Sequence, residues 1–275
     1  MGMTIANGVL DTMHARAIPS SGEELPVIGM GTWQTFDVAP SDAQRLAPVV
    51  DAFAAAGGRL IDSSPMYGRA EEVAGRLRGH LPNAFVATKV WTRGREEGER
   101  EIERSMRLMR ADPIDLIQIH NLLDWRTHLG TLRRLKDEGR VRYIGITHYV
   151  KSAFDDLASI MRSEQIDFVQ LPMSITLPDA ERRLLPLAAE RRIAVIVNRP
   201  FEGGSLFRRG ALSPIARELG IESWGELFLR WIIAHEEVTC VIPATANIEH
   251  LRENLRAGEQ RLLTRDECDA LRAAL

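Results

Sequence analysis

The sequence predicts a single (β/α)8 TIM barrel preceded by a short N-terminal β-hairpin. Eight short apolar segments alternate along the 275 residues with about eight amphipathic segments that have helical spacing. Several of the short segments are nearly continuous apolar runs, which is typical of parallel strands covered by helices on one side. No linker or change of composition divides the chain. An open doubly wound sheet is the alternative, but eight units in about 250 residues favour the closed barrel.

The N-terminal part predicts a loose segment at residues 1–14 and a single barrel domain at residues 15–275. A Ser-Gly turn at residues 21–22 is expected to join the two strands of the hairpin. The first barrel strand is then expected at Val27–Gly31, where the sequence becomes apolar. Together these segments place the hairpin just before the barrel begins.

The remaining elements follow the same alternation. Ser41 is expected to cap the first helix, which stops at Gly57 and Gly58. Later strands are predicted at 59–62, 84–90, 114–120, 141–147, 167–171, 193–198 and 238–243. Later helices are predicted at 69–79, 97–110, 127–139, 152–163, 179–192, 222–236 and 247–258. The long irregular segment 199–214 is expected to be functional, because long loops inside compact domains usually are.

Composition favours a soluble cytoplasmic protein, with a monomer as the expected state. The formal net charge is −3, which gives no electrostatic reason to expect a nucleic acid or an anionic membrane as partner. No run of 18 apolar residues predicts a membrane span, and the N-terminus lacks the pattern of a secretory signal. The two cysteines, Cys240 and Cys268, form no metal-like pair, and Cys240 is expected to be a buried thiol.

Polar residues stand where the predicted strands end, and in such barrels the chemistry lies at the carboxyl ends of the strands. The second strand ends in Asp62, and Tyr67 lies in the loop that follows. The third strand ends with Lys89 and the fourth with His120. The period-two alternation of strands places Lys89 and His120 on adjacent strands at the same mouth of the barrel, provided that both face inward. We therefore expect these four side chains to converge.

These four residue types suit a site that polarises and protonates a carbonyl group. A phenol with a pKa of about 10 is protonated at neutral pH, and a nearby ammonium is expected to lower that pKa. Asp62 would keep Lys89 charged and oriented, while His120 could donate a hydrogen bond to an oxygen that gains negative charge. The group lacks a nucleophile of its own, so a separate hydride donor is required.

The sequence resembles the aldo-keto reductase family over nearly its whole length. The matching segments, in the order expected for the family, are GMGTWQ, LIDSSPMYG, ATKVW, DLIQIHN, GIT, DFVQ and VIPATANIEHLRENL. The resemblance implies a barrel that binds NADP(H), with NAD(H) possible, and transfers a hydride to a small-molecule aldehyde or ketone. It also implies that Tyr67 is the general acid, that Lys89 and Asp62 tune it, and that His120 orients the carbonyl. No Rossmann glycine fingerprint follows the first strand, and this family needs none.

The resemblance further implies a set of cofactor-binding residues. Gln170 would hold the nicotinamide carboxamide, with Thr147 and His148 where the family commonly has Ser-Asn. Asn198 stands where many members have a tyrosine that stacks on the nicotinamide, although Phe201 is near. The implied set is Thr32, Trp33, Asp62, Thr147, His148, Gln170, Asn198, Arg199, Phe201, Gly203, Gly204, Ser205, Leu206, Thr245, Asn247, Arg252, Glu253 and Asn254.

Two positions depart from the common family pattern. Ala244 and His250 stand where many members have Lys and Arg against the ribose 2′-phosphate, which weakens the expected discrimination for NADPH over NADH. Arg252 or Arg199 would have to compensate. For the substrate pocket, the tryptophans that follow the first, third and fourth strands are the candidate walls: Trp33, Trp91 and Trp125.

Two other functions remain open from the sequence. A regulatory or sensor barrel could bind the cofactor with little turnover. A Schiff-base aldolase could use Lys89, but a neighbouring Asp62 that keeps the amine charged opposes that use. A metallohydrolase fits less well, because no cluster of His and Asp gathers at the strand ends, and we expect no metal.

Overall fold

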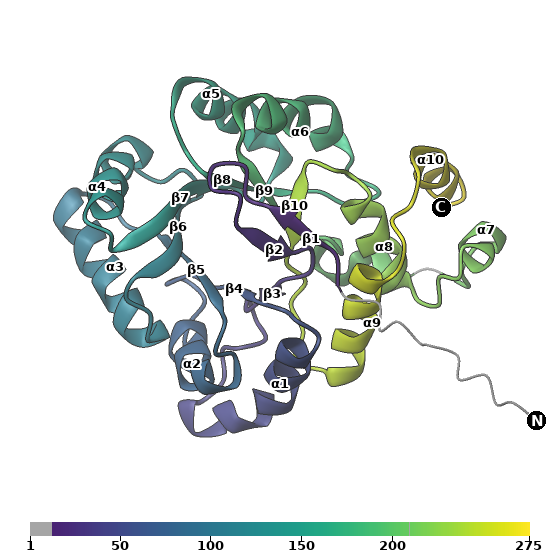
Figure 1. The fold of residues 1–275 in the computed structure, drawn as a ribbon, viewed down its shortest axis with the longest axis horizontal. Coiled ribbons are helices and arrows are strands. Elements are labelled where there is room, and N and C mark those ends of the chain that lie inside the picture. The colour runs from purple at the N-terminus through teal and green to yellow at the C-terminus, as the bar shows by residue number, and fades with distance from the viewer. Residues whose placement is uncertain (1–12, 209) are drawn as a thin grey trace, which may run out of the picture.

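The computed structural model, which describes residues 13–208 and 210–275, is a barrel of eight parallel strands ringed by helices (Figure 1). Each strand from β3 to β10 pairs in parallel with the next, and the segment at Ile28 and Gly31 pairs with Val241 and Ala244 to close the ring. This confirms the predicted fold class. The strands are β3 Met30–Gly31, β4 Leu60–Asp62, β5 Phe85–Val90, β6 Ile114–His120, β7 Val141–Thr147, β8 Phe168–Pro172, β9 Ala194–Asn198 and β10 Val238–Val241.

Ten α-helices and four short 3-10 segments are present in the described residues. The α-helices are α1 Ala47–Ala55, α2 Ala70–Arg76, α3 Arg95–Met109, α4 Trp125–Asp137, α5 Phe154–Ser163, α6 Asp179–Arg191, α7 Pro214–Glu218, α8 Trp224–Ile233, α9 Ile248–Glu259 and α10 Arg265–Ala273. The 3-10 segments are η1 Pro40–Leu46, η2 Arg78–His80, η3 Lys151–Ala153 and η4 Glu202–Phe207. The sequence did not predict α7 or α10, although Thr264 and Glu267 form a capping box before α10.

The start of the first helix differs from the prediction. Ser41 does not cap it: the chain enters η1 after Ala39, which makes no side-chain cap. The α-helix begins only at Ala47, and Pro48 lies in its first turn. Proline has no N–H to donate to the preceding turn, so regular α-helical hydrogen bonding starts at this point.

The predicted hairpin is present and closes one end of the barrel. Strands β1 Ala15–Ala17 and β2 Glu24–Pro26 pair antiparallel and lie across the ring in Figure 1. Ile18 and Leu25 from the hairpin pack into the same apolar cluster as the inward side chains of the strands. The expected loose segment falls almost entirely on residues 1–12, outside the described residues, and the single domain at 15–275 stays a prediction.

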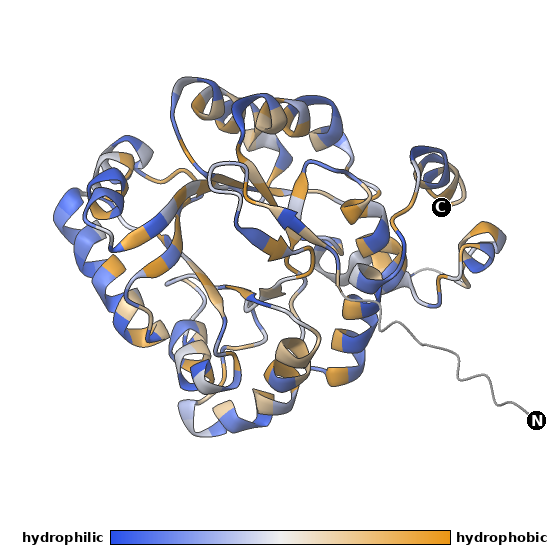
Figure 2. Cartoon of the chain, viewed as in Figure 1, coloured by the Kyte–Doolittle hydropathy of each residue, from blue (hydrophilic) through white to orange (hydrophobic). Residues whose placement is uncertain are grey.

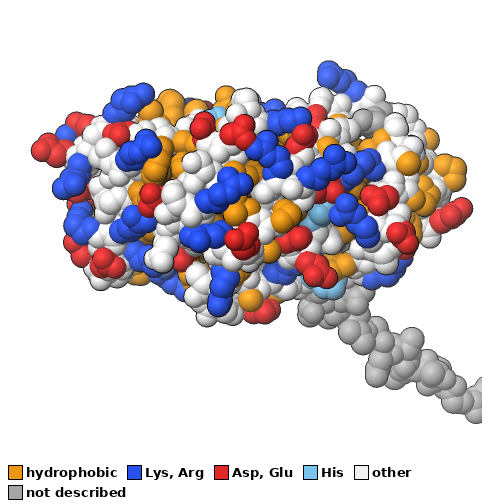
Figure 3. All heavy atoms as spheres, turned by 90° about the horizontal axis from the view of Figure 1, so that it is seen from above, with side chains coloured by type: hydrophobic (Ala, Val, Ile, Leu, Met, Phe, Trp, Pro, Cys, Tyr) orange, Lys and Arg blue, Asp and Glu red, His pale blue; other side chains and the backbone are white. Residues whose placement is uncertain are grey.

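Two apolar layers hold the barrel together. The larger lies between strands and helices, and the orange inward sides of the helices in Figure 2 follow it. The smaller fills the barrel interior, with Phe85, Leu116 and Phe168 near the hairpin end. The outer surface in Figure 3 carries acidic and basic side chains interspersed. No helix in the described part of the chain is long and apolar enough to cross a membrane.

Candidate active site

Polar side chains replace the apolar filling at the end of the barrel opposite the hairpin. Strand β5 turns Phe85, Ala87 and Lys89 inward, and the first two belong to the interior apolar cluster. Lys89 pairs in register with Gln118 on β6, and His120 lies two residues further along that strand. Strand pairing therefore brings Asp62, Lys89 and His120 to one mouth, as the alternation predicted.

The centre of this group is a buried ion pair. The Lys89 Nζ donates to Asp62 Oδ2 at 2.6 Å and to the Ser63 carbonyl oxygen at 2.7 Å. The other carboxylate oxygen, Oδ1, accepts hydrogen bonds from Gln118 Nε2 at 3.1 Å and from Gln170 Nε2 at 3.0 Å. Burial by itself would lower the pKa of Lys89, but the charges and hydrogen bonds of Asp62 and Tyr67 together outweigh burial, and the pKa of Lys89 is raised. The lysine is therefore held as an ammonium.

Tyr67 reaches this pair from the turn after β4. The Lys89 Nζ lies 5.1 Å from the centroid of the Tyr67 ring. That ring meets the His120 ring edge to face, with 5.9 Å between centroids. The sequence predicted a lowered pKa for the phenol, and this direction was wrong. Burial raises the pKa of Tyr67 more than the charge of Lys89 lowers it.

His120 is neutral in this environment. Burial and the positive charge of Lys89 lower its pKa to about 2. Its Nδ1 lies 2.9 Å from the Ser64 hydroxyl, which itself accepts a hydrogen bond from the Met66 backbone N–H. The Ser64 hydrogen is thus available for Nδ1, which would leave the imidazole hydrogen on Nε2.

A cavity of about 620 Å³ opens above these four residues. Ten of the predicted cofactor residues line it: Thr32, Trp33, Asp62, Thr147, Gln170, Asn198, Arg199, Phe201, Gly203 and Gly204. The other eight do not: His148, Ser205, Leu206, Thr245, Asn247, Arg252, Glu253 and Asn254. Among these, Asn247 caps α9 and Arg252 pairs with Glu249. Both are thus engaged within the start of that helix. Ala244 lines the cavity, whereas His250 does not.

One wall of the cavity is a layer of amide and hydroxyl groups. The Thr147 hydroxyl donates to Gln170 Oε1 at 3.1 Å, and Asn198 Nδ2 lies 3.3 Å from the same oxygen. Asn198 Nδ2 also lies 3.3 Å from the His148 carbonyl oxygen. His148 thus contributes its backbone here. Through Gln170 this layer connects to Asp62.

The cavity is lined both by groups that suit an amide and by groups that suit an anion. At the inner end, the buried Asn198 Oδ1 has no hydrogen-bond partner. Further along the cavity, Gly203 and Gly204 have φ of 68° and 88°, and a Cβ at Gly204 would meet nothing within 4 Å. The exposed Arg199 supplies a cation beside this open backbone. These features fit a nicotinamide dinucleotide.

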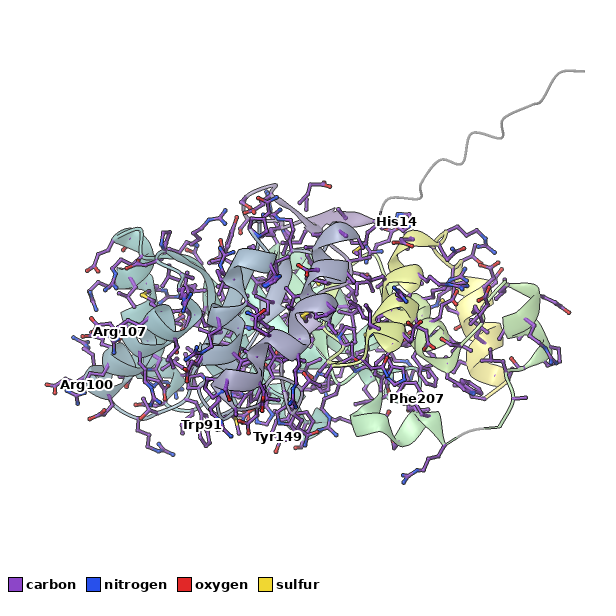
Figure 4. The ribbon with its side chains drawn as sticks, turned by 90° about the horizontal axis from the view of Figure 1, so that it is seen from below. His14, Trp91, Arg100, Arg107, Tyr149 and Phe207 are labelled. Carbon is purple, nitrogen blue, oxygen red and sulfur yellow. The ribbon has the colours of Figure 1, made fainter. Side chains whose placement is uncertain are left out.

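The mouth of the cavity is ringed by exposed apolar side chains. Of the six large hydrophobic residues exposed in the described part of the chain, five line this cavity: Trp33, Met66, Trp91, Tyr149 and Phe207. In Figure 4, Trp91, Tyr149 and Phe207 lie on the side of the molecule opposite His14, which precedes the hairpin. Such a concentration of exposed apolar surface is typical of a binding site.

Trp125 is not part of this rim. It begins α4, packs against the outer core, and carries the Arg126 guanidinium 4.3 Å from its ring. Trp91 is at the cavity, and its backbone N–H donates to the Glu101 carboxylate on α3. The two candidate walls that the structure brings to the cavity are thus Trp33 and Trp91.

Sequence reasoning missed three contributors to the site. Gln118 donates to Asp62, Ser64 bonds His120, and Asn121 lines the cavity with an unpaired Oδ1. The alternation on β6 already placed Gln118 on the inward face, so its position was a usable signal. Nothing in the sequence distinguished Ser64 from an ordinary turn residue.

The site is an acid–base constellation and holds no cluster typical of a metal. Among the described residues, no group of three or more His, Cys, Asp or Glu could hold a metal ion. Cys240 and Cys268 are both buried and free, so the predicted burial of Cys240 is confirmed. A (β/α)8 barrel with a buried Asp–Lys pair under a tyrosine and a histidine indicates an oxidoreductase of the carbonyl-reducing kind.

The model of the aldo/keto reductase family matches residues 27–275. The chain therefore belongs to the aldo/keto reductase family and is an oxidoreductase of that type. It is similar to methylglyoxal reductase YeaE of Escherichia coli, with 27% identity over 266 residues covering 91% of this chain and 92% of that protein.

Solved structures of the family have the same fold. A Klebsiella pneumoniae aldo/keto reductase in complex with NADP and acetate is 25% identical, with a TM-score of 0.78 and 91% of each chain covered. A structure of a Klebsiella pneumoniae aldo-keto reductase in complex with NADPH superposes with a TM-score of 0.80 at 24% identity, with 94% of each chain covered.

Proposed function

We propose that the protein reduces a small-molecule aldehyde or ketone to an alcohol with NADPH. The observation that carries this proposal is the buried Asp62–Lys89 pair beneath Tyr67 and His120, at the inner end of the cavity. The NADP complex of the Klebsiella pneumoniae relative supports the choice of cofactor. When bound, the cofactor supplies the hydride, and the side chains of this chain supply the proton and the geometry.

Tyr67 is the general acid of the proposed reaction. Its raised pKa keeps the phenol protonated at neutral pH, so it arrives at the carbonyl oxygen with its proton in place. The Lys89 ammonium stabilises the phenolate that remains after the proton leaves, and Asp62 fixes that ammonium. General acids in such positions contribute about 10²–10⁴-fold to the rate.

His120 orients the carbonyl group. Being neutral, with Ser64 on Nδ1, it can present its Nε2 hydrogen to the same carbonyl oxygen. An imidazolium here would add a second cation beside Lys89, which the buried site disfavours. Tyr67 and His120 thus hold the oxygen between two donors.

The substrate enters over the apolar rim. Trp33 and Trp91 would contact the body of the carbonyl compound, so molecules with an apolar or aromatic body should bind better than highly charged ones. We propose that the protein acts as a cytoplasmic monomer and has no nucleic-acid or membrane partner. Among the described residues that line the cavity, Ala244 is uncharged and Arg199 is the only Lys or Arg, so NADPH is preferred over NADH by a smaller ratio than a paired Lys and Arg would give.

A Schiff-base aldolase is disfavoured by the state of Lys89. Its side chain is fully buried, hydrogen-bonded to Asp62 and Ser63, and has a raised pKa. A nucleophilic amine must be neutral and accessible to the carbonyl carbon. Reductive trapping of a substrate on Lys89 would revive this alternative.

Substitution of Tyr67 by Phe tests the proposed function. We expect Tyr67→Phe to lower kcat/KM for an aryl aldehyde by about 10²–10⁴-fold while leaving the NADPH dissociation constant within about twofold. A panel of aldehydes and ketones distinguishes the enzyme from a regulatory barrel. Tight NADPH binding without oxidation across the panel would support the regulatory barrel, and full turnover by Tyr67→Phe would exclude this residue as the acid.

A further inference from the structure

Gln118 contacts the buried ion pair but does not line the cavity. It lies on β6 in register with Lys89 on β5, and 0% of its surface is exposed. Its Nε2 donates to Asp62 Oδ1 at 3.1 Å. Gln170 donates to the same oxygen at 3.0 Å, but Gln170 also lines the cavity. Gln118 is therefore placed to act on the reaction through Asp62 and not by touching a ligand.

Packing alone does not account for a glutamine at this position. Its Oε1 is buried and has no hydrogen-bond partner within the described residues. A flipped amide would set Oε1 against the Asp62 carboxylate, so this contact fixes which atom donates. Gly145 on β7 is paired with Gln118 and makes room for it, because a Cβ there would lie 3.3 Å from Gln118 Cγ. A hydrocarbon side chain would fill this space without an unpaired oxygen, so the N–H donor is what distinguishes glutamine here.

A donor on Asp62 Oδ1 changes the charge that Tyr67 experiences. The other carboxylate oxygen, Oδ2, lies 2.6 Å from Lys89 Nζ, which itself lies 5.1 Å from the centroid of the Tyr67 ring. Burial has the largest effect on the pKa of Tyr67 and raises it, the charge of Lys89 lowers it, and the charge of Asp62 raises it. An N–H on Oδ1 offsets part of the carboxylate charge, so the ammonium acts more strongly on the phenol.

We infer that Gln118 is a positioning residue for proton transfer. Its amide offsets part of the Asp62 charge and holds Oδ2 toward Lys89, so the ammonium better stabilises the phenolate that Tyr67 leaves. This inference rests on the proposed function. Without the donor, the carboxylate neutralises the ammonium more fully and is held by fewer bonds. Tyr67 then gives up its proton less readily, and carbonyl reduction slows although substrate and NADPH bind as before.

Two variants of nearly the same shape separate the donor from the space that it fills. Gln118→Met fills the site without a donor. Gln118→Glu has a donor only while its carboxyl is protonated, and burial beside Asp62 should raise the pKa of that carboxyl well above the ordinary value of about 4.3. Leu116→Met is the matched control, because Leu116 lies two residues before Gln118 on β6, within the interior apolar cluster.

The assay is the rate of NADPH oxidation in a single turnover with benzaldehyde, at about pH 6 and about pH 9, with the folded protein counted by NADPH fluorescence titration. Gln118→Met should be about tenfold slower at both pH values, with KM and the NADPH dissociation constant within about twofold. Gln118→Glu should stay within about twofold of the natural rate at the lower pH. At the higher pH it should fall to the rate of Gln118→Met or below once its carboxyl ionises beside Asp62, and a natural rate at both pH values would show that the carboxyl keeps its donor. Leu116→Met should stay within about twofold throughout.

The titratable groups around the ion pair do not produce this pH dependence. Lys89 on β5 and Tyr67 in the turn after β4 have pKa values raised above their ordinary 10.5 and 10.0. The pKa of His120 on β6 is about 2, and burial raises the pKa of the Cys240 thiol on β10. Glu71 on α2, whose carboxyl interacts with the charge of Lys89, has a pKa raised by burial and is present in every variant. Each variant is therefore compared with the natural protein at the same pH.

Three results would overturn the inference. If Gln118→Met keeps the natural rate, the donor does not matter. If Gln118→Glu at about pH 6 is as slow as Gln118→Met, hydrogen donation is not what the glutamine supplies. If Leu116→Met is slowed as much as Gln118→Met, packing of the barrel interior sets the rate. In each case the natural protein still reduces benzaldehyde and the proposed function stands, whereas a natural protein that reduces no carbonyl compound would remove both.

Discussion

Replacement of Asp62 by Asn should destabilise the protein by leaving a buried cation without its charge partner. Lys89 has 0% of its side chain exposed and donates to Asp62 Oδ2 at 2.6 Å. Asparagine has the shape of the lost carboxylate, so the surrounding packing is kept and the change is mainly one of charge. Removal of one partner of a buried pair costs about 3–5 kcal/mol in the free energy of unfolding.

The mirror variant, Lys89→Met, leaves Asp62 with two neutral donors, Gln118 Nε2 and Gln170 Nε2. Those bonds offset part of the loss, so we expect about 3 kcal/mol, the lower end of the same range. In Asp62→Asn/Lys89→Met neither member of the pair carries a charge, and the combined loss should be about 2 kcal/mol or less. The sum of the two single losses would be at least about 6 kcal/mol. This double-mutant cycle therefore distinguishes a coupled pair from two independent residues.

The assay is urea denaturation of the natural protein and the three variants at pH 7. The pKa of Lys89 in the folded state is raised above its ordinary value of 10.5. Its contribution is therefore fully present below pH 10.5 and is lost only as the pH rises through the folded-state pKa. Measurement at pH 7 captures all of it. Additive losses in the double variant would refute the assignment of Asp62 and Lys89 as one electrostatic unit.

Three further predictions concern His120, Gly204 and Trp91. The folded-state pKa of His120 is about 2, against an ordinary value of 6.5. Between these values the unfolded chain binds a proton on His120 that the folded protein does not bind. Below pH 6.5 this costs up to about 1.4 kcal/mol per pH unit, and urea denaturation of His120→Gln should show a pH slope flatter by that amount. Gly204→Val should weaken NADP⁺ binding up to about tenfold, because a side chain is strained at φ 88°, and unchanged affinity in a titration would contradict this role. Trp91→Ala should raise KM for benzaldehyde about tenfold with the NADPH dissociation constant within about twofold, and a rise in that constant instead would place Trp91 against the cofactor.

The sequence predicted that Asp62, Lys89 and His120 come together, because strand geometry is regular. Alternation along β5 and β6 defines which residues face inward, and the parallel arrangement brings their ends to one mouth. The same rule placed Gln118 inward. Its hydrogen bond to Asp62 needed coordinates, because a glutamine on that face could equally be filling space.

The positions of the residues implied to bind the cofactor were predicted less well, because many of these residues lie on loops or at the start of a helix. Ten of eighteen implied residues line the cavity, and the ones that do not include five from the segment around α9. The Asn247 side chain caps that helix. Sequence spacing alone could not distinguish this capping role from a role in ligand binding. Loop conformation depends on contacts with distant segments, so a resemblance of motif does not fix where each side chain ends.

The sequence by itself determined the barrel, the hairpin and the convergence of Asp62, Lys89 and His120, since these follow from the number of alternating segments, the Ser-Gly turn and the period-two pattern of the strands. Only the tertiary structure showed the direction in which the pKa of Tyr67 shifts, the lack of a partner for the Asn198 Oδ1 and the apolar rim of the cavity. Each of these depends on how deeply a group is buried and which distant groups surround it. Desolvation and hydrogen-bond satisfaction are properties of that three-dimensional environment, and they outweigh what neighbouring residues in the chain indicate.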